Sequence, residues 1–315
     1  MPALFIFGAF GLIVGSFLNV VILRFGERSI GGRSACSACG MQLGWYDLIP
    51  VFSWLALSGR CRSCHERISI QYPLVEAATA IFFSLIAGAG LPLYTTAVAL
   101  VIISILICIF VYDLRHKLIP DLWVGLFCVC ALVFAFTEFN TSYFIPHTSY
   151  ILIAGPVAAL PILFLWALSY PFVGFAGAWM GFGDVKLALG IGWLLAVPTS
   201  IGLPLGFLAI MFAFIIGATV SVCILLPLPY FVQWWHTLRG RAHAAKAASL
   251  RPVAGIGIGS NVDDQTLPTT ASPSDHAAFA AGYTMRSEVP FGPFLVASCV
   301  LLWFAVLYNI SIPFL

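Results

Sequence analysis

The chain contains few charged residues. Only 8% of its 315 residues are Asp, Glu, Lys or Arg, whereas 61% are hydrophobic. A soluble domain carries about 25% charged residues, so this composition excludes an ordinary soluble enzyme and predicts an all-α polytopic membrane protein. The formal net charge of +2 is too small to indicate a nucleic-acid-binding protein.

Uninterrupted hydrophobic runs indicate about eight transmembrane helices, because each run is long enough to cross about 30 Å of hydrocarbon. No Lys or Arg precedes the first run and no cleavage-like stretch follows it, so we expect this run to remain as a span rather than leave as a signal peptide. The predicted spans are residues 3–23, 74–91, 94–112, 119–137, 150–170, 186–203, 205–231 and 291–312.

The basic residues predict the orientation of these spans. All fourteen Lys and Arg fall in or beside the loops that follow the first, third, fifth and seventh spans. Lys and Arg are retained on the cytoplasmic side of a membrane, so these loops are expected in the cytoplasm and both termini outside it. The expected parts are a first transmembrane helix (1–24), a cytoplasmic loop (25–73), a transmembrane core (74–235), a flexible cytoplasmic loop (236–288) and a last transmembrane helix (289–315).

Four of the nine cysteines lie in the first cytoplasmic loop as two CxxC pairs, Cys36/Cys39 and Cys61/Cys64. Four thiolates satisfy tetrahedral Zn²⁺ without leaving an open position, so the spacing predicts a small, structural zinc-binding loop domain. Two disulfides or free thiols are the alternatives. Disulfides are disfavoured because the cytoplasm is reducing.

Two aspartates, Asp113 and Asp184, lie where hydrophobic spans meet short loops. An ionisable group near bilayer depth is costly, so such a residue is a functional candidate. Asp184 closes the sequence Gly181-Phe-Gly, whose glycines permit a tight turn and a close approach by another chain. Aspartic peptidases hydrolyse peptide bonds with two carboxyl groups that share one proton. The pair therefore predicts an intramembrane aspartyl peptidase.

Other interpretations remain open at this point. An Asp at a span end is often a helix cap, and Asp121, after Pro120, is expected to have that role. A transporter would also place acids in its spans, although it would be expected to show matching halves. A non-enzymatic assembly factor would use the cysteine loop for docking and would not need the aspartates. Presenilin-type proteases share Gly-x-Gly-Asp but are not expected to carry a tetracysteine loop.

Several motifs in order resemble the type IV prepilin peptidases, which are bifunctional leader peptidase/N-methyltransferases of bacterial cytoplasmic membranes. Besides the two CxxC pairs and the Asp113 segment, the resemblance rests on Gly15-Ser-Phe-Leu-Asn-Val-Val-Ile-Leu-Arg24, Leu43-Gly-Trp-Tyr-Asp-Leu-Ile-Pro50, Ile68-Ser-Ile-Gln-Tyr-Pro73 with Glu76, Gly181-Phe-Gly-Asp-Val-Lys186 and Pro290-Phe-Gly-Pro293.

The resemblance implies that Asp113 and Asp184 are the catalytic pair and that the four loop cysteines hold zinc. It also implies the substrates: type IV prepilins or pseudopilins, cut after a glycine at the cytoplasmic face, and then S-adenosylmethionine as the donor that methylates the new α-amine. A peptidase without the second activity is the alternative.

Two polar residues near the cysteine loop are candidates for methyl transfer. Asn19 lies inside the first span and Glu76 lies near the start of the second, and either could orient the amine or the sulfonium of the methyl donor. The competing interpretations are a helix–helix hydrogen bond for Asn19 and an interfacial ion pair with Arg24 or Arg67 for Glu76.

Overall fold

The computed structural model describes residues 2–26, 31–138, 144–173, 181–196, 204–225 and 290–310. Within these residues the backbone forms helices and turns, with isolated β-bridges and no strand. The fold is therefore all-α, as predicted. The chain divides into two units, Met1–Phe214 with Pro290–Leu315 and Ile215–Val289. The loop expected at 236–288 lies outside the described residues.

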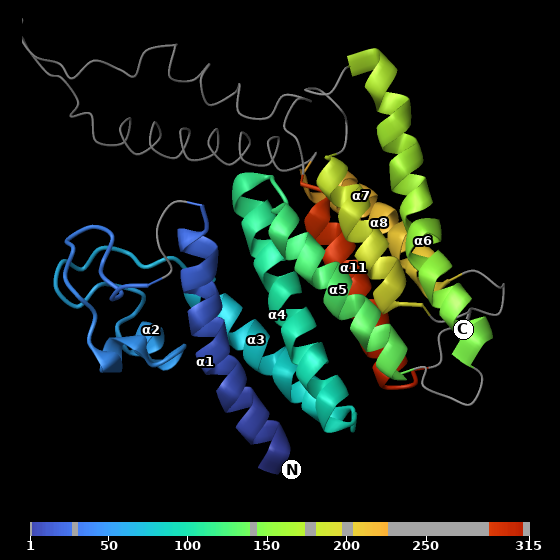
Figure 1. Ribbon diagram of the computed structural model, residues 1–315. Helices are drawn as coiled ribbons and strands as arrows, with labels where there is room; N and C mark the ends of the chain where they lie inside the picture. Colours follow the sequence, from blue (N-terminus) through green and yellow to red (C-terminus); the bar gives the residue numbers. More distant parts are fainter. Residues whose placement is uncertain are drawn as a thin grey trace, which may run out of the picture. The chain divides into compact units, whose positions relative to one another are not determined.

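The long helices of the described residues overlap the eight predicted spans (Figure 1). Five of them contain windows long and apolar enough to cross a membrane, and two shorter apolar helices accompany them. In chain order the long helices are α1 (Pro2–Arg24), α3 (Gln71–Gly88), α4 (Leu93–His116), α5 (Asp121–Glu138), α6 (Phe144–Val173), α7 (Phe182–Leu194), α8 (Leu205–Val220) and α11 (Gly292–Leu307).

Helix lengths differ from the predicted spans at two places. Helix α6 has 30 residues and extends past both ends of the predicted span 150–170. Helix α7 begins at Phe182 and has only 13 residues, about 20 Å. It therefore starts four residues before the predicted span 186–203 and is too short to cross the hydrocarbon alone. The second unit begins within α8, which continues into one π-helical turn, Ser221–Leu225.

Helices α1 and α3 pack against each other over most of their length. A Cβ atom placed on Gly11 would lie 2.7 Å from Cα of Ala80, and one on Gly15 would lie 2.7 Å from Cα of Glu76. Small residues allow helix backbones to approach closely in a membrane, where no hydrophobic effect drives helices together. The glycines of α1 therefore determine this pairing.

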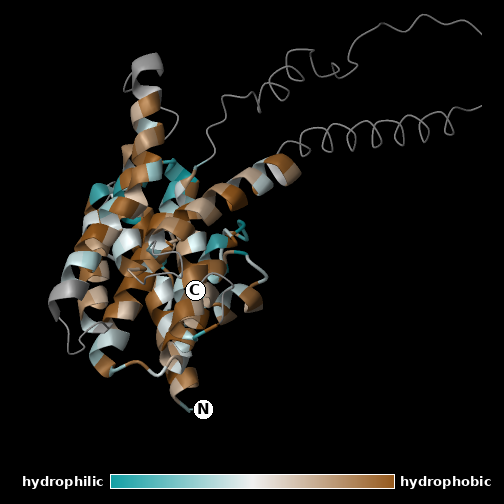
Figure 2. Ribbon diagram, turned by 90° about the vertical axis from the view of Figure 1, so that its right-hand side faces the viewer, coloured by the Kyte–Doolittle hydropathy of each residue, from teal (hydrophilic) through white to brown (hydrophobic). Residues whose placement is uncertain are grey.

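Helix α4 lies at the centre of the first unit and contacts α1, α3, α5 and α11. Helix α7 packs against α5, α6 and α11. The end of α4 and the starts of α7 and α11 lie together at the upper end of this unit (Figure 1). Hydrophobic residues dominate the helices, and many of the hydrophilic ones lie toward the upper end (Figure 2). This end is therefore the part of the unit in which polar chemistry is concentrated.

Candidate active site and metal-binding loop

Asp113 lies in the last turn of α4 and is buried, with 4% of its surface exposed. The helix ends just beyond it because Lys117 adopts a left-handed conformation, with φ 52°, and donates its N–H to the Asp113 carbonyl at 2.8 Å. The neighbouring Tyr112 packs edge-on against Phe25 and Trp123, with ring centroids 5.7 and 5.2 Å away. These contacts fix the end of α4 against the end of α1 and the start of α5.

Asp184 lies in the first turn of α7 and is also buried, with 7% exposed. Gly181 caps the helix in an extended conformation, and its carbonyl accepts the Asp184 N–H at 3.1 Å. The unsatisfied N–H groups of a helix N-terminus stabilise a negative charge. Leu187 and Ala188, both fully buried, hold this turn against the core. The sequence Gly-Phe-Gly-Asp therefore places a carboxyl group on a firmly packed helix start.

The structure brings Asp113 and Asp184 together. Their carboxyl groups are close enough for a direct Coulombic interaction. Ile119, in the short connection after α4, fits between the glycines of two other helix starts: its Cβ would lie 3.1 Å from a Cβ on Gly183, and its Cδ1 3.0 Å from one on Gly292. The backbone N–H of Gly292 interacts with the Asp113 carboxyl group, although within the described residues Oδ2 of Asp113 is buried and makes no well-aligned hydrogen bond. The start of α11 is therefore the nearest source of a donor for this carboxyl group.

Gly292, the first residue of α11, is a site residue for which the sequence reasoning assigned no role. A Cβ atom on Gly292 would lie 2.5 Å from Oδ2 of Asp113, closer than van der Waals contact permits. Only glycine therefore leaves room for the Asp113 carboxyl group in its present position. The signal was the motif Pro290-Phe-Gly-Pro293, in which the glycine precedes the proline at the helix start.

Asp121 and Lys186 form an ion pair next to the aspartates, with Nζ to Oδ1 at 2.8 Å. Asp121 begins α5 and Lys186 lies two residues after Asp184, so the pair joins the starts of α5 and α7. The Lys186 ammonium also lies 5.3 Å from the ring centre of Phe182. Since the two side chains are 74% and 39% exposed, this contact orients α7 more than it stabilises the fold.

Glu76 and Asn19 do not join the aspartates but lie between α1, α3 and the cysteine loop. Oε2 of Glu76 accepts the backbone N–H of Val51 at 2.8 Å. The Asn19 amide donates to the carbonyls of Tyr72 at 3.1 Å and Gly15 at 3.3 Å. Both side chains are buried. Asn19 therefore makes the interhelical hydrogen bond that was one of its two interpretations, while Glu76 anchors the loop.

Each CxxC pair of the loop sits on a turn of the same design. Cys36 donates its N–H to Met41 and accepts one from Gly40, at 2.9 Å each. In the second turn Cys61 donates to Glu66 at 2.8 Å and accepts from His65 at 3.0 Å. The residue after each second cysteine, Gly40 or His65, has a positive φ. The two turns therefore present their sulfur atoms in equivalent ways.

The four sulfur atoms form one cluster. They all lie within 4.8 Å of one another, and those of Cys36 and Cys64 are 3.8 Å apart. Zn–S bonds of about 2.3 Å in a tetrahedron place sulfur atoms about 3.8 Å apart. A disulfide needs about 2.05 Å, and all four are free cysteines. The cluster therefore has the composition and spacing to bind a metal ion such as zinc.

Backbone N–H groups lower the pKa of one of the four cysteine thiols. The N–H of Cys39, followed by that of Ala38, lowers the pKa of Cys36 to about 6. At Cys64 the N–H of Glu66 acts in the same direction, but desolvation and the neighbouring sulfur atoms outweigh it and raise the pKa to about 12. Cys36 therefore loses its proton more readily than an ordinary cysteine, and thiols that bind a metal do so as thiolates.

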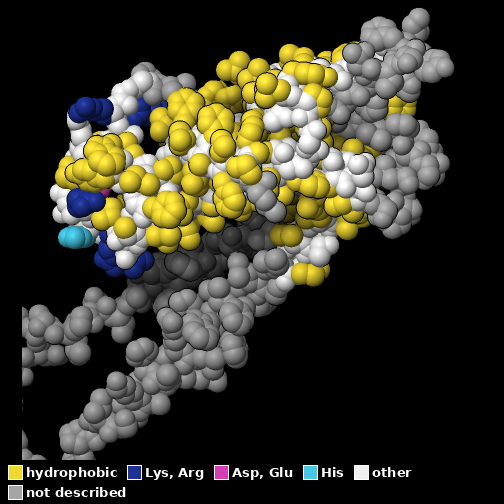
Figure 3. Space-filling model, turned by 90° about the horizontal axis from the view of Figure 1, so that it is seen from below, with side chains coloured by type: hydrophobic (Ala, Val, Ile, Leu, Met, Phe, Trp, Pro, Cys, Tyr) yellow, Lys and Arg dark blue, Asp and Glu magenta, His cyan; other side chains and the backbone are white. Residues whose placement is uncertain are grey.

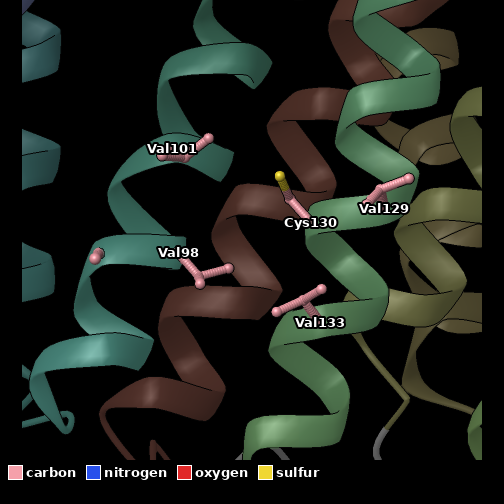
Figure 4. Close-up of a pocket in the computed structure, with 6 residues that line it drawn as sticks. Val98, Val101, Val129, Cys130 and Val133 are labelled. Atoms are coloured by element: carbon pink, nitrogen blue, oxygen red, sulfur yellow. The ribbon is translucent and has the colours of Figure 1, made fainter.

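The structure also has an apolar hollow of about 240 Å³ between α4 and α5 (Figure 4). Its lining consists of Ala97, Val98, Val101, Val129, Cys130 and Val133. Val101 precedes Asp113 by twelve residues on α4, about 18 Å along the helix. The hollow offers almost no polar surface for binding or catalysis, so it is separate from the aspartate site.

Two family models match the chain. The bacterial peptidase A24 N-terminal domain matches residues 9–89, which include the cysteine loop, and the type IV leader peptidase family matches residues 100–222, which include both aspartates. No solved structure matches the chain.

Among curated relatives, the prepilin leader peptidase/N-methyltransferase of Myxococcus xanthus is 46% identical over 38% of this chain but only 36% of its own length. Proteins of the same name from Pectobacterium carotovorum and Klebsiella pneumoniae are each 34% identical. Those matches cover 59% and 60% of this chain, and 73% and 86% of the relatives. The chain therefore belongs to the type IV leader peptidase family, a family of membrane enzymes that includes the prepilin leader peptidase/N-methyltransferases.

Proposed function

We propose that this protein removes the leader of type IV prepilins or pseudopilins, with Asp113 and Asp184 as its catalytic pair. One observation carries the proposal. Two buried carboxyl groups, one from the end of α4 and one from the start of α7, lie within interaction range at the upper end of the first unit. The names of the relatives support the substrate class.

The two carboxyl groups divide the chemistry of hydrolysis between them. Because two neighbouring carboxylates repel each other, the pair holds one shared proton. The ionised member takes a proton from a water molecule, whose oxygen attacks the scissile carbonyl carbon, while the protonated member donates to the carbonyl oxygen. The C–N bond then breaks, and the leaving amine takes up the proton gained from water. The products are a leader with a free carboxylate and a pilin with a free α-amine.

The position of the site suits a substrate with a short basic leader and a hydrophobic helix. The helix would lie in the bilayer beside the spans, and the scissile bond after the glycine would lie level with the aspartates at the cytoplasmic boundary. The positive-inside distribution of Lys and Arg supports a cytoplasmic site and extracytoplasmic termini. The bacterial sources of the relatives support a location in the bacterial cytoplasmic membrane.

We further propose that the cysteine loop serves methylation of the new α-amine. Zn²⁺ held by Cys36, Cys39, Cys61 and Cys64 would supply a closed structural centre for a loop with little core of its own. S-adenosylmethionine would supply the methyl group. Glu76, buried beside the loop, remains our candidate for orienting the amine or the sulfonium. Asn19 is a weaker candidate, because its amide already joins α1 to α3.

The test separates the two reactions. Purified protein receives a prepilin-like peptide with S-adenosylmethionine, and mass spectrometry follows cleavage and methyl transfer independently. Asp113→Asn or Asp184→Asn should abolish cleavage but leave methylation of a pre-cleaved peptide largely intact. Asp121→Asn, at an exposed acid near the same helix ends, is the matched control: it breaks only the ion pair with Lys186 and should lower cleavage by no more than about fivefold.

Continued cleavage by both asparagine variants would contradict the aspartyl mechanism. Cleavage by the wild-type protein without any methyl transfer would instead favour a peptidase that lacks the second activity.

A further inference from the structure

The loop after α1 does not simply project away from the transmembrane helices. Glu76 packs at the level of Gly15 on α1, nine residues before Arg24 at the helix end and therefore about 13.5 Å along the axis. The Val51 N–H, in the middle of the loop, bonds to Glu76 at 2.8 Å. In Figure 1 the short helix α2 (Phe52–Ala56) that follows is drawn at the level of the middle of α1. The loop thus returns along the side of the helices.

The segment that returns exposes large apolar side chains on one side. Trp45 is 78% exposed, and Phe52 and Leu55, three residues apart on α2, are 65% and 60% exposed. Trp54 points inward instead: its Nε1 donates to the Ile68 carbonyl at 3.3 Å, and its ring covers Gly59. Trp54 therefore packs against the loop itself, whereas the side chains of Trp45, Phe52 and Leu55 are exposed and hydrophobic.

The charged groups around this segment leave no free acid on it. Asp47, the single acidic residue between 45 and 57, pairs with Arg62 at 2.8 Å and accepts the Gly44 N–H at 3.2 Å. The Arg62 guanidinium lies 4.9 Å from the ring centre of Tyr46. Aromatic rings beside arginines are typical of the boundary between lipid and water, where anionic headgroups attract the cations.

We propose that residues 45–57 form a membrane-embedded segment, with Phe52 and Leu55 in the acyl region of the cytoplasmic leaflet and Arg62 among its phosphates. Its outer face would continue the lipid-facing surface of α1, where Phe10, Ile13 and Phe17 are half to two-thirds exposed. Thirteen residues are too few to cross the bilayer as a helix, so the segment enters and leaves on the same side.

The lower face of the loop supports this placement. Seen from the end at which α1 begins, hydrophobic side chains lie among other side chains and backbone on the side of the loop, with Lys, Arg and a His toward the edge (Figure 3). If α1 spans the membrane, the face of the loop seen in this view is the face turned toward the interior of the bilayer. The membrane therefore accounts for the exposed side chains without a protein partner, and the inference does not depend on the peptidase assignment.

Photo-crosslinking of the full-length protein tests the proposal. p-Benzoylphenylalanine replaces Phe52, or Leu55 as a second position, and the protein is placed in nanodiscs of phosphatidylethanolamine and phosphatidylglycerol. Ser37, exposed in the first cysteine turn, receives the same residue as the matched control. A monodisperse peak in size-exclusion chromatography and an unchanged helical circular-dichroism spectrum show that each variant is folded.

After illumination, mass spectrometry should detect lipid adducts at positions 52 and 55 at least tenfold more often than at position 37. Equal yields at all three positions would overturn the proposal. So would adducts at 52 and 55 that join a second copy of the chain or an added prepilin instead of lipid, because the exposed face would then be a protein-binding surface.

Discussion

At the scale of single residues, the site depends on the close contact between the Asp113 carboxyl group and the backbone of Gly292. Adding one methyl group there, as Gly292→Ala, must displace either the carboxyl group or the start of α11. A displacement of about 1 Å between catalytic groups can lower a rate about a hundredfold. We expect a loss of cleavage of this order, measured with a prepilin-like peptide.

Gly125→Ala is the matched control for this substitution, because a Cβ atom at Gly125 meets nothing within 4 Å. In the interior of α5 alanine is also the better helix former, so this variant should cleave like the wild type. If both variants retained full cleavage, Asp113 would not need its present position.

The ion pair between Asp121 and Lys186 is also a residue-scale feature, because it joins the starts of α5 and α7. Lys186→Asp should place two like charges side by side and reduce cleavage, whereas the swap Asp121→Lys with Lys186→Asp should restore most of it. Since both groups are partly exposed, the coupling should be about 1 kcal/mol or less, or about fivefold in rate. A double-mutant cycle on cleavage rates measures it, and additive effects would show that the pair has no orienting role.

At the scale of elements, the cysteine loop should depend on its metal more than the helices do. We expect one zinc per chain, measured by elemental mass spectrometry of freshly purified, reduced protein. Cys61→Ser, or a strong chelator, should remove the metal and abolish methyl transfer first, with cleavage reduced only through weaker substrate docking. Cys223→Ser, at an exposed cysteine outside the loop, should change neither reaction.

A purified protein without zinc, or one that methylates normally after its zinc is removed, would refute the structural role of the metal. Cleavage that fails together with methylation would show that the loop also organises the aspartate site.

At the scale of the whole molecule, the eight predicted spans and the one-sided distribution of Lys and Arg give both termini the same orientation. Alkaline phosphatase fused after residue 310 should therefore be active, since it folds only outside the cytoplasm. Green fluorescent protein inserted between residues 240 and 285 should fluoresce, since it folds in the cytoplasm. A fluorescent fusion at the C-terminus would contradict this topology.

Much of this molecule could be predicted from sequence, because hydropathy depends on composition and not on tertiary contacts. The helices and the two CxxC turns follow from local patterns, whereas the pairing of Asp113 with Asp184 was implied by the family resemblance and not by either motif alone. The short α7 was predicted at 186–203 because the apolar run continues past Leu194, where the helix ends. Hydropathy does not show where within an apolar run a helix begins or ends.

The features that sequence could not predict depend on contacts between distant segments. Gly292 meets Asp113 across 179 positions of the chain, and Val51 meets Glu76 through a backbone group that carries no sequence signal. Val51 also adopts a positive φ, 61°, which is unfavourable for a β-branched residue. Such a conformation is specified by its surroundings and not by the residue itself.

The close pairing of α1 and α3 has a consequence for how the cysteine loop assembles. Because Gly11 and Gly15 let the two helices meet backbone to backbone, both stems of the loop are held together before any metal arrives. The packing of α1 against α3 therefore offsets the entropic cost of bringing the two ends of the loop together, and metal binding does not have to. The intact protein should therefore retain zinc at chelator concentrations that strip a synthetic peptide of residues 31–70.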